Sequence, residues 1–416
     1  MKTWLEIAYF AGFDWARDHH DVVIVDRQGK IVEQFRLDHS QEGWGQWRKK
    51  TASFAPLAVA IETSFGGVVD QLLRGEATVY PVNPKSAQRY RDRKVPSGSK
   101  TDFLDAWSLA DALRIDGHGW KALVPTDPLT SQLQILCRDE VHLIGQRTLF
   151  VNQLQQALLE YYPAAMEAFE DWTMASTWEF IIEFPTPRAL VKAGKRRWEK
   201  FLHVHKLWRT ETAEKRMGIF ARADQFSSSA ALTAAKSVLA VSLAKMLRTL
   251  QQQLDVYHAQ IEALFAQHPD HDLFGSLPGA GSFLAPRLLS EIGGGPDRFE
   301  SAQHLQAIAG TAPVSYQSGQ IDKVRIRHHC DKFLRYTVHL WSDCSRKKCL
   351  WAQVYYQKKR EEGKSHACAL RCLGQRWLKI IWKMLQTHVP YDPELHAKNQ
   401  QLHGSWVLSL QTKTVQ

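Results

Sequence analysis

Four acidic residues in the first quarter of the chain constrain its fold more than any other feature. Asp14 and Glu62 each lie at the end of an apolar, strand-like run. Asp102 and Asp105 lie three residues apart in a segment with helical spacing, so they share one helix face. One fold can gather all four carboxylates at one point, where they repel one another unless a cation neutralises them. The pattern therefore predicts a divalent metal site.

The chemistry of these ligands narrows the choice of metal. Carboxylate oxygens are hard donors that favour Mg²⁺ or Mn²⁺. A pair of such ions can hold both the attacking and the leaving oxygen of a phosphodiester exchange. We therefore expect a pair of Mg²⁺ or Mn²⁺ ions and a reaction at phosphate.

The first 115 residues show an order of elements that indicates a fold. The patterns predict strands at 10–16, 21–26, 30–37, 56–64 and 77–84, and helices at 41–50, 65–76 and 101–114. Three consecutive strands followed by alternating helices and strands is the order of the ribonuclease H fold, an α/β architecture. This order puts Asp14 on the central strand and Glu62 at the carboxyl end of the fourth, where open α/β sheets bind ligands.

Each of these acids taken alone has a plainer interpretation, because Asp and Glu are common at strand ends and on exposed helix faces. Four acids at the expected places favour a functional cluster instead. Asp111 continues the predicted helix but lies six positions beyond Asp105, on a different face. It is therefore left out of the site.

After residue 130 the pattern becomes that of long helices. Residues 129–162 and 230–266 carry apolar side chains at helical spacing. They predict an antiparallel hairpin or a coiled-coil dimer arm, and packing against the chain's own domains is an alternative that the sequence does not separate. Between them, the basic segment 193–206 either touches nucleic acid or forms a solvated face.

Residues 273–293 resemble a helix-hairpin-helix, in which Pro-Gly-Ala-Gly joins two helices. Gly279 and Gly281 would leave backbone amides open to a DNA phosphate, although the same pattern also occurs as a plain turn. We expect a mostly helical C-terminal domain around this element. The predicted organisation is an α/β ribonuclease H-like (RuvC-like) domain at 1–128, a helical or coiled-coil region at 129–268, the C-terminal domain at 269–390 and a tail at 391–416.

The distribution of charge favours a polyanionic partner. The chain has a net charge of +10 and a pI of about 9.2. Two basic runs, at 85–100 and 321–348, lie beside the candidate site residues. From these runs we expect nucleic acid to contact Lys85, Arg89, Arg91, Arg93, Lys94, Lys100, Lys323, Arg325 and Arg327.

Membrane insertion and secretion are not expected. No apolar run approaches the roughly 20 residues that span a bilayer, and the N-terminus lacks a cleavable signal pattern, so we expect a cytoplasmic protein acting at the nucleoid. The six cysteines form no CxxC pair, which favours reduced, buried thiols. A zinc site would need an irregular set, drawn from Cys330, Cys344 and Cys349 with His328 and His329.

Taken together, these motifs identify a family. The acids of GFDWA, AIETS and KTDFLDA, the helical middle, the PGAG hairpin, GTAPVSYQSG and a closing helix pair resemble the DEDD-type insertion-sequence transposases, which include the Piv-type DNA invertases. The resemblance covers about residues 9–393. By this resemblance the four acids would be the metal ligands of a RuvC-like domain. Ser318, followed by Gly319, would be the nucleophile of a C-terminal transposase domain.

The resemblance also implies partners and an intermediate. Recombinases of this family attack DNA phosphate with the serine and form a covalent phosphoserine link, with a partner subunit completing the active centre. The expected partners are therefore the DNA of the element ends and of the target, and a second copy in a homodimer or homotetramer. Some members are guided by a structured RNA from the element itself, which makes such an RNA a further expected partner.

A serine mechanism requires neighbouring groups that activate the serine hydroxyl. A serine hydroxyl is a poor nucleophile until its proton is removed or a metal or cationic cluster holds its oxygen. Arg325 and Arg327 could stabilise the charge that builds on the phosphorane. Ser315 lies three positions earlier in the same expected loop, and we prefer Ser318 because a glycine follows it.

Three other functions remain open at this stage. A metal-dependent RuvC-like nuclease would need the acids but no serine, and a catalytically inactive nucleic-acid-binding protein would need neither. A small-molecule kinase shares the ribonuclease H core, but the chain lacks a second glycine-rich phosphate loop. It also has no GxxxxGK[ST] motif, in keeping with recombination that needs no ATP.

Overall fold

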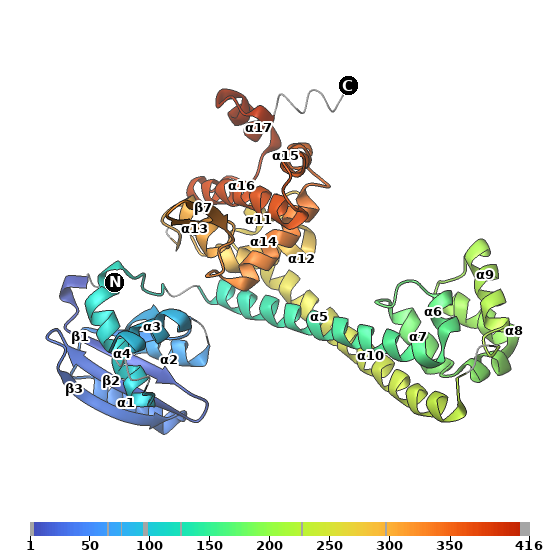
Figure 1. Ribbon diagram of the computed structural model, residues 1–416, viewed down its shortest axis with the longest axis horizontal. Coiled ribbons are helices and arrows are strands. Elements are labelled where there is room, and N and C mark those ends of the chain that lie inside the picture. Colours follow the sequence, from blue (N-terminus) through green and yellow to red (C-terminus); the bar gives the residue numbers. More distant parts are fainter. Residues whose placement is uncertain are drawn as a thin grey trace. The chain divides into compact units, whose positions relative to one another are not determined.

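The chain folds into two compact units, which divide at Pro125/Thr126 (Figure 1). The computed structural model describes residues 4–64, 66–75, 77–94, 99–124, 127–225, 228–295 and 298–407. Each unit is described by itself. The four-part division expected from the sequence stays a prediction.

The N-terminal unit is built on a five-stranded mixed sheet. Its strands are β1 (Tyr9–Trp15), β2 (His19–Asp26), β3 (Ile31–Asp38), β4 (Leu57–Ile61) and β5 (Thr78–Pro81). Their order is β3-β2-β1-β4-β5; β2 is antiparallel to both β1 and β3, while β4 is parallel to both β1 and β5. The central position of β1 and the mixed order are consistent with the predicted ribonuclease H-like domain.

Helices cover both faces of this sheet. They are α1 (Gln41–Thr51), α2 (Gly67–Arg74), α3 (Pro84–Lys94) and α4 (Asp102–Asp116), with short 3₁₀ turns at Trp4–Glu6 and Gly117–Gly119. One core joins α1 and α2 to one face, and a second core joins α3 and α4 to the other. Because both faces are covered, β4 is buried along its whole length, which explains its unbroken apolar run.

A glycine sets how closely α4 crosses the central strand. A Cβ on Gly12 would lie 1.8 Å from the carbonyl oxygen of Ala106, so only glycine permits this approach. Alternate residues of a strand share a face, so Asp14 lies on the same face as Gly12. The first turn of α4 is thereby held near the end of β1 that carries Asp14.

The C-terminal unit is dominated by two long helices, α5 (Pro128–Tyr161) and α10 (Ala230–Gln267), which lie antiparallel and side by side (Figure 1). Arg147 donates to Gln251 at 2.7 Å, and Lys236 pairs with Glu160 at 2.8 Å. The two helices therefore pair within the chain, as an antiparallel hairpin, which is one of the arrangements predicted from the sequence. A coiled-coil contact between chains stays a prediction.

One finding differs from the expectation about apolar runs. By length and composition α10 could cross a membrane, alone among the helices of the described residues. We expected no apolar run near the roughly 20 residues that span a bilayer. The helix packs against α5 and α7 (Ala175–Glu183), and one helix of this kind is weak evidence for a membrane span.

A helical cluster closes one end of the α5–α10 pair. It comprises α6 (Pro163–Ala168), α7, α8 (Pro187–Val204) and α9 (Thr210–Ala221). These helices share an aromatic-rich core with the ends of α5 and α10. The basic segment 193–206 falls largely in α8, where Trp198 and Phe201 are buried and the cations Lys195, Arg196 and Arg197 are exposed.

The other end of the pair packs into a second helical core. Its elements are α11 (His271–Gly275), α12 (Gly281–Ile292), α13 (Ala302–Ile308), β6 (Val314–Ser318), β7 (Ile321–Arg325), α14 (Lys332–Ser345), α15 (Leu350–Glu361), α16 (His366–Thr387) and α17 (Pro393–Leu402). Trp341, Trp351 and Trp377 lie at its centre. Tyr391, the first residue of the expected tail, is buried there and accepts a hydrogen bond from the Trp351 indole at 2.9 Å. The chain therefore stays joined to this core through Tyr391.

Candidate active site

Three charged residues form a row across three neighbouring strands. Asp14 on β1 is the register partner of Asp21 on β2, and Asp21 is the partner of Arg36 on β3. Directly opposite residues of antiparallel strands point to the same face of a sheet. The row therefore lies on the face that α4 covers, and the alternation from Ala58 and Ala60 brings Glu62 to that face as well.

The predicted acids act on one another electrostatically. Burial comes first in raising the pKa of Asp14 from its usual 3.8 to about 7, and four neighbouring carboxylates add to the effect. In decreasing order of effect these are Asp105, Glu62, Asp102 and Asp21. Burial followed by the charge of Asp105 also raises the pKa of Glu62. All four acids predicted from the sequence therefore lie in one region of strong negative potential.

Two of the predicted nucleic-acid contacts offset this potential. Arg91 of α3 donates to Asp105 at 2.7 Å. Arg91 and Lys100 both lower the pKa of Glu62, against the effect of burial. Arg91 thus turns inward to the acids, whereas Lys85, Arg89, Arg93 and Lys100 are exposed.

Lys94 also turns inward, toward the acid that we left out of the site. Asp111 is buried and forms ion pairs with Lys94 and Arg114. Burial alone would raise the pKa of Asp111, but these two cations lower it. Lys94 and Arg114 therefore neutralise the buried carboxylate of Asp111, which has a structural role. The Lys94 side chain is held in this ion pair.

Helix capping fixes the two acids of α4. Thr101 is the N-cap and accepts a hydrogen bond from the Leu104 amide, so Asp102 and Asp105 both stand in the first turn. Carboxylates are stabilised there by the positive end of the helix dipole. Asp105 faces the sheet near Asp14, whereas Asp102 is more exposed and lies beside β2 and β3.

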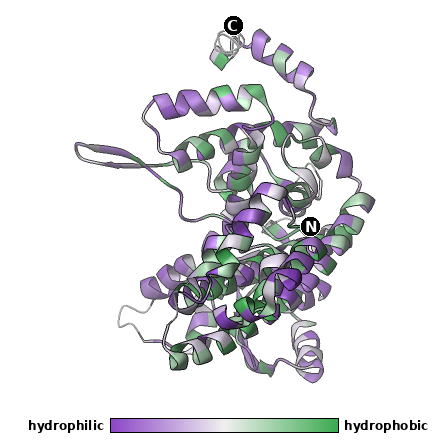
Figure 2. Ribbon diagram, turned by 90° about the vertical axis from the view of Figure 1, so that its right-hand side faces the viewer, coloured by the Kyte–Doolittle hydropathy of each residue, from purple (hydrophilic) through white to green (hydrophobic). Residues whose placement is uncertain are grey.

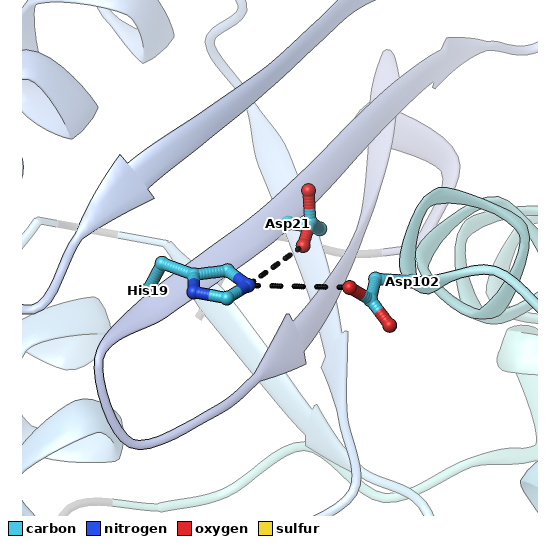
Figure 3. A group of neighbouring side chains, drawn as sticks. All are labelled: His19, Asp21 and Asp102. Atoms are coloured by element: carbon cyan, nitrogen blue, oxygen red, sulfur yellow. Dashed lines mark ion pairs between the residues drawn. The ribbon is translucent and has the colours of Figure 1, made fainter.

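The closest potential metal-ligating group among the described residues was not predicted in full. The donor atoms of His19, Asp21 and Asp102 lie within 4.8 Å of one another (Figure 3). The His19 ring lies 3.8 Å from the carboxylate of Asp21 and 3.9 Å from that of Asp102. Asp14, Glu62 and Asp105 are not members of this group, although their charges act on one another. The sequence analysis missed His19, Asp21 and Arg36. Only the strand register reveals that these residues lie on the same face of the sheet as Asp14.

Ser318 lies in the C-terminal unit, on a two-stranded ribbon. β6 and β7 form an exposed hairpin that projects from the surrounding helices, and Gly319 takes the positive φ of 56° at its turn (Figure 2). The register pairs Tyr316 with Lys323, and Val314 with Arg325. Ser318, two residues beyond Tyr316, therefore shares a face with these two cations. Arg325 also stacks on the Tyr316 ring, 3.9 Å from its centre.

Ser315 lies on the opposite face of this ribbon. Its partner is Val324, and the next pair on that face is Gln317 with Asp322. That face carries an acid and no lysine or arginine. Arg327 lies beyond the end of β7, where its carbonyl accepts from Arg335. The two candidate serines are thus distinguished by the charge of the surface around them.

The glycines of the PGAG turn have positive φ angles, 74° for Gly279 and 55° for Gly281. A Cβ on Gly279 would lie 2.9 Å from the backbone of Cys344 in α14, so packing already accounts for this glycine. Gly281 begins α12 and has open space around it. Among the described residues, the cysteines and histidines considered for zinc do not gather into a metal-ligating group.

Comparison with known proteins gives consistent matches. Residues 11–163 match a family model described as "Transposase", and residues 271–357 match one described as "Transposase IS116/IS110/IS902 family". The chain is 32% identical over 404 residues to the "Mini-circle putative transposase for IS117" of Streptomyces coelicolor, covering 93% of this chain and 96% of that protein. It is 30% identical to the 42 kDa protein of insertion element IS900 of Mycobacterium paratuberculosis, covering 92% and 97%. A shorter match, 29% over 127 residues, is to the pilin gene-inverting protein of Moraxella bovis, covering 30% and 39%.

Proposed function

Because the chain belongs to the IS116/IS110/IS902 family of transposases, we propose that it cuts and rejoins the DNA of an insertion sequence through a covalent link to Ser318. Its relatives are transposases of insertion sequences, so the chain is a DNA transposase. The proposal adds the nucleophile, the metal site and the partners to this assignment.

The observation that carries the proposal is the register of the β6–β7 ribbon. Ser318 shares its face with Lys323 and Arg325, whereas Ser315 shares its face with Asp322. A phosphate approaching the cationic face would meet Ser318 and be repelled from the other face. A two-stranded ribbon also fits the major groove of DNA. The charge of the two faces therefore favours Ser318 over Ser315.

The acid cluster fits a divalent metal. Burial, with four neighbouring carboxylates adding to its effect, raises the pKa of Asp14 to about 7, and acids perturbed in this way gather at functional sites. We propose that the ligands are Asp14, Glu62, Asp102 and Asp105. Mg²⁺ or Mn²⁺ bound there, as a pair of ions, would polarise the scissile phosphate and help to deprotonate the nucleophile.

The proposed reaction conserves the phosphodiester bond energy. The Ser318 hydroxyl attacks phosphorus, so that a serine–phosphorus ester forms while the bond from phosphorus to the 3′ oxygen breaks. The leaving 3′ oxygen takes the proton, and Lys323 and Arg325 stabilise the extra charge on the phosphoryl oxygens. The 3′ hydroxyl of the exchange partner then attacks the phosphoserine and restores the serine, so ATP is not required.

We propose further that the enzyme acts as a homodimer or homotetramer on element-end and target DNA, with a structured guide RNA. Support comes from the net charge of +10 and the exposed cations Lys85, Arg89, Arg93 and Lys100 beside the acids. Gly281, at the open start of α12, is a further proposed phosphate contact.

The test is a suicide-substrate assay with nicked element-end DNA, its guide RNA and Mg²⁺, run on a denaturing gel. We expect a covalent protein–DNA band with the wild type and with Ser315→Ala, and no band with Ser318→Ala or Asp14→Asn. Ser315→Ala is the matched control, because it removes a hydroxyl from the same ribbon. Cleavage that persists in Ser318→Ala without any adduct would instead indicate a metal-dependent nuclease.

A further inference from the structure

Asp21 is a buried carboxylate with a fully formed partner. Its side chain is 2% exposed, and both of its oxygens accept from Arg36. Nε donates to Oδ1 at 3.0 Å, and Nη2 donates to Oδ2 at 2.8 Å. This two-point pairing is the geometry in which arginine binds a carboxylate most strongly. A buried carboxylate without such a partner would be strongly destabilising.

The same guanidinium reaches one of the proposed metal ligands. Nη2 of Arg36 also donates to Oδ2 of Asp102 at 3.1 Å. Asp102 points from the first turn of α4 toward Asp21 and His19, as Figure 3 shows. Its side chain is 54% exposed, so little packing restrains its rotamer. The contact with Arg36 is therefore the main restraint that the described contacts place on this carboxylate.

The proposal follows from this shared contact and rests on the metal site proposed above. We infer that Arg36 is a positioning residue for that site: by pairing with Asp21 it orients the Asp102 carboxylate and keeps Asp21 from becoming a competing ligand. Asp102 uses only Oδ2 to accept from Arg36, which leaves Oδ1 for a metal. Metal-binding carboxylates commonly depend on such outer hydrogen bonds, and losing one weakens metal affinity by about 10- to 100-fold.

A merely structural role for Arg36 predicts something different. In that case Arg36 would matter only because the buried Asp21 needs a cation, and its loss would act through stability. Replacing Asp21 with asparagine removes this need. The two roles therefore separate in the double variant Arg36→Ala/Asp21→Asn, which lacks both the buried charge and the donor to Asp102.

The experiment measures Mn²⁺ binding to the full-length protein by electron paramagnetic resonance, together with the Tm of the metal-free protein. We expect Arg36→Ala to lower both Tm and Mn²⁺ affinity. The double variant should recover most of the lost Tm, while its Kd for Mn²⁺ stays about 10-fold or more above that of the wild type. Arg36→Lys should also bind weakly, because lysine cannot reproduce the forked contact to two carboxylates.

A matched control is Lys50 of α1, which pairs with the strand that carries Arg36. Lys50 pairs with Glu33 of β3, which alternation places on the other face of the sheet from Arg36. Lys50→Ala removes a cation of similar exposure and should leave the Kd for Mn²⁺ unchanged. A double variant that recovers both Tm and wild-type Mn²⁺ affinity would overturn the inference and leave the metal site standing. A wild type that does not bind Mn²⁺, or whose binding survives Asp105→Asn, would overturn the metal site and the inference with it.

Discussion

At the scale of single residues, the chain concentrates charge at the proposed metal site and on one face of the ribbon that carries Ser318. Asp14 is held among four other carboxylates, and Arg36 pairs with the one that is buried. On the ribbon, the charge around Ser318 differs from that around Ser315. The proximity of the four acids was predictable from sequence, because acids at strand ends and in a first helical turn are local patterns. Their role as metal ligands and the role of Ser318 stay predictions. Asp21 and Arg36 were not predictable, since their roles depend on pairing between strands.

The raised pKa of Asp14 predicts how the stability of the metal-free protein depends on pH. Between about pH 4 and pH 7 the folded state retains a proton that the unfolded state has released, so the free energy of unfolding falls as pH rises and levels off above pH 7. Asp14→Asn removes this contribution. We expect the variant to exceed the wild type by on the order of 1 kcal/mol at pH 8, after allowing for solvent screening, and much less at pH 4.

Thermal unfolding in EDTA at pH 4, 6 and 8 measures this difference. Added Mg²⁺ should raise the Tm of the wild type at pH 8 and have less effect on Asp14→Asn. An advantage of the variant that is the same at pH 4 and pH 8 would contradict the raised pKa.

At the scale of elements, the site depends on how α4 crosses the sheet. Alternation and helical spacing predicted the strands of the N-terminal unit and its helices α1, α2 and α4, because both faces of the sheet bury regular apolar patterns. Helix α3 was not predicted, because it is a basic segment in which Ala87 is the buried residue. The helical spacing of apolar residues also predicted the two long helices, α5 and α10. What the sequence did not reveal is the close crossing at Gly12, because an isolated glycine in a strand has several explanations. The two faces of the β6–β7 ribbon were also hidden, since they follow from its register.

The crossing at Gly12 predicts a large effect from one methyl group. In Gly12→Ala the new Cβ would lie 1.8 Å from the Ala106 carbonyl, so α4 must move and carry Asp102 and Asp105 away from Asp14. We expect a loss of about 3 kcal/mol or more in the free energy of unfolding of the N-terminal unit. Denaturant unfolding measures it.

Gly45→Ala, within α1, is the matched control. No atom lies within 4 Å of its new Cβ, so we expect a gain of roughly 0.5–1 kcal/mol from helix propensity. Equal effects of the two substitutions would show that α4 does not depend on the glycine at position 12.

At the scale of the whole chain, the acids lie in the N-terminal unit and Ser318 lies in the helical C-terminal unit. The sequence indicated the two candidate regions through their motifs, of which Asp105 and Ser318 lie 213 residues apart (318 − 105). It did not indicate the buried polar contacts inside the helical unit. Glu140 of α5 and Arg287 of α12 are nearly fully buried and joined at 2.7 Å, which ties the long helix to the core that carries the ribbon. Such contacts follow no local pattern.

The buried pair of Glu140 and Arg287 predicts that the C-terminal unit loses much of its stability when one partner is removed. Glu140→Ala leaves the Arg287 guanidinium buried and without its carboxylate, so we expect a loss of about 3–5 kcal/mol in the C-terminal unit. Hydrogen–deuterium exchange in α5 and α12 should rise accordingly. The control is Glu167→Ala, which breaks an ion pair with Arg222 that is half exposed and should cost about 1 kcal/mol or less. Similar costs for the two would contradict the role given to the buried pair.

The central claim is that Ser318 carries the covalent link to DNA, and identifying the modified residue tests it most directly. The adduct formed on nicked element-end DNA is digested with nuclease and protease, and mass spectrometry locates the remaining phosphonucleotide on a peptide. The account predicts that the nucleotide is attached to Ser318, through its Oγ. A nucleotide on Ser315 or on another residue, or cleaved DNA ends with no modified peptide, would contradict it.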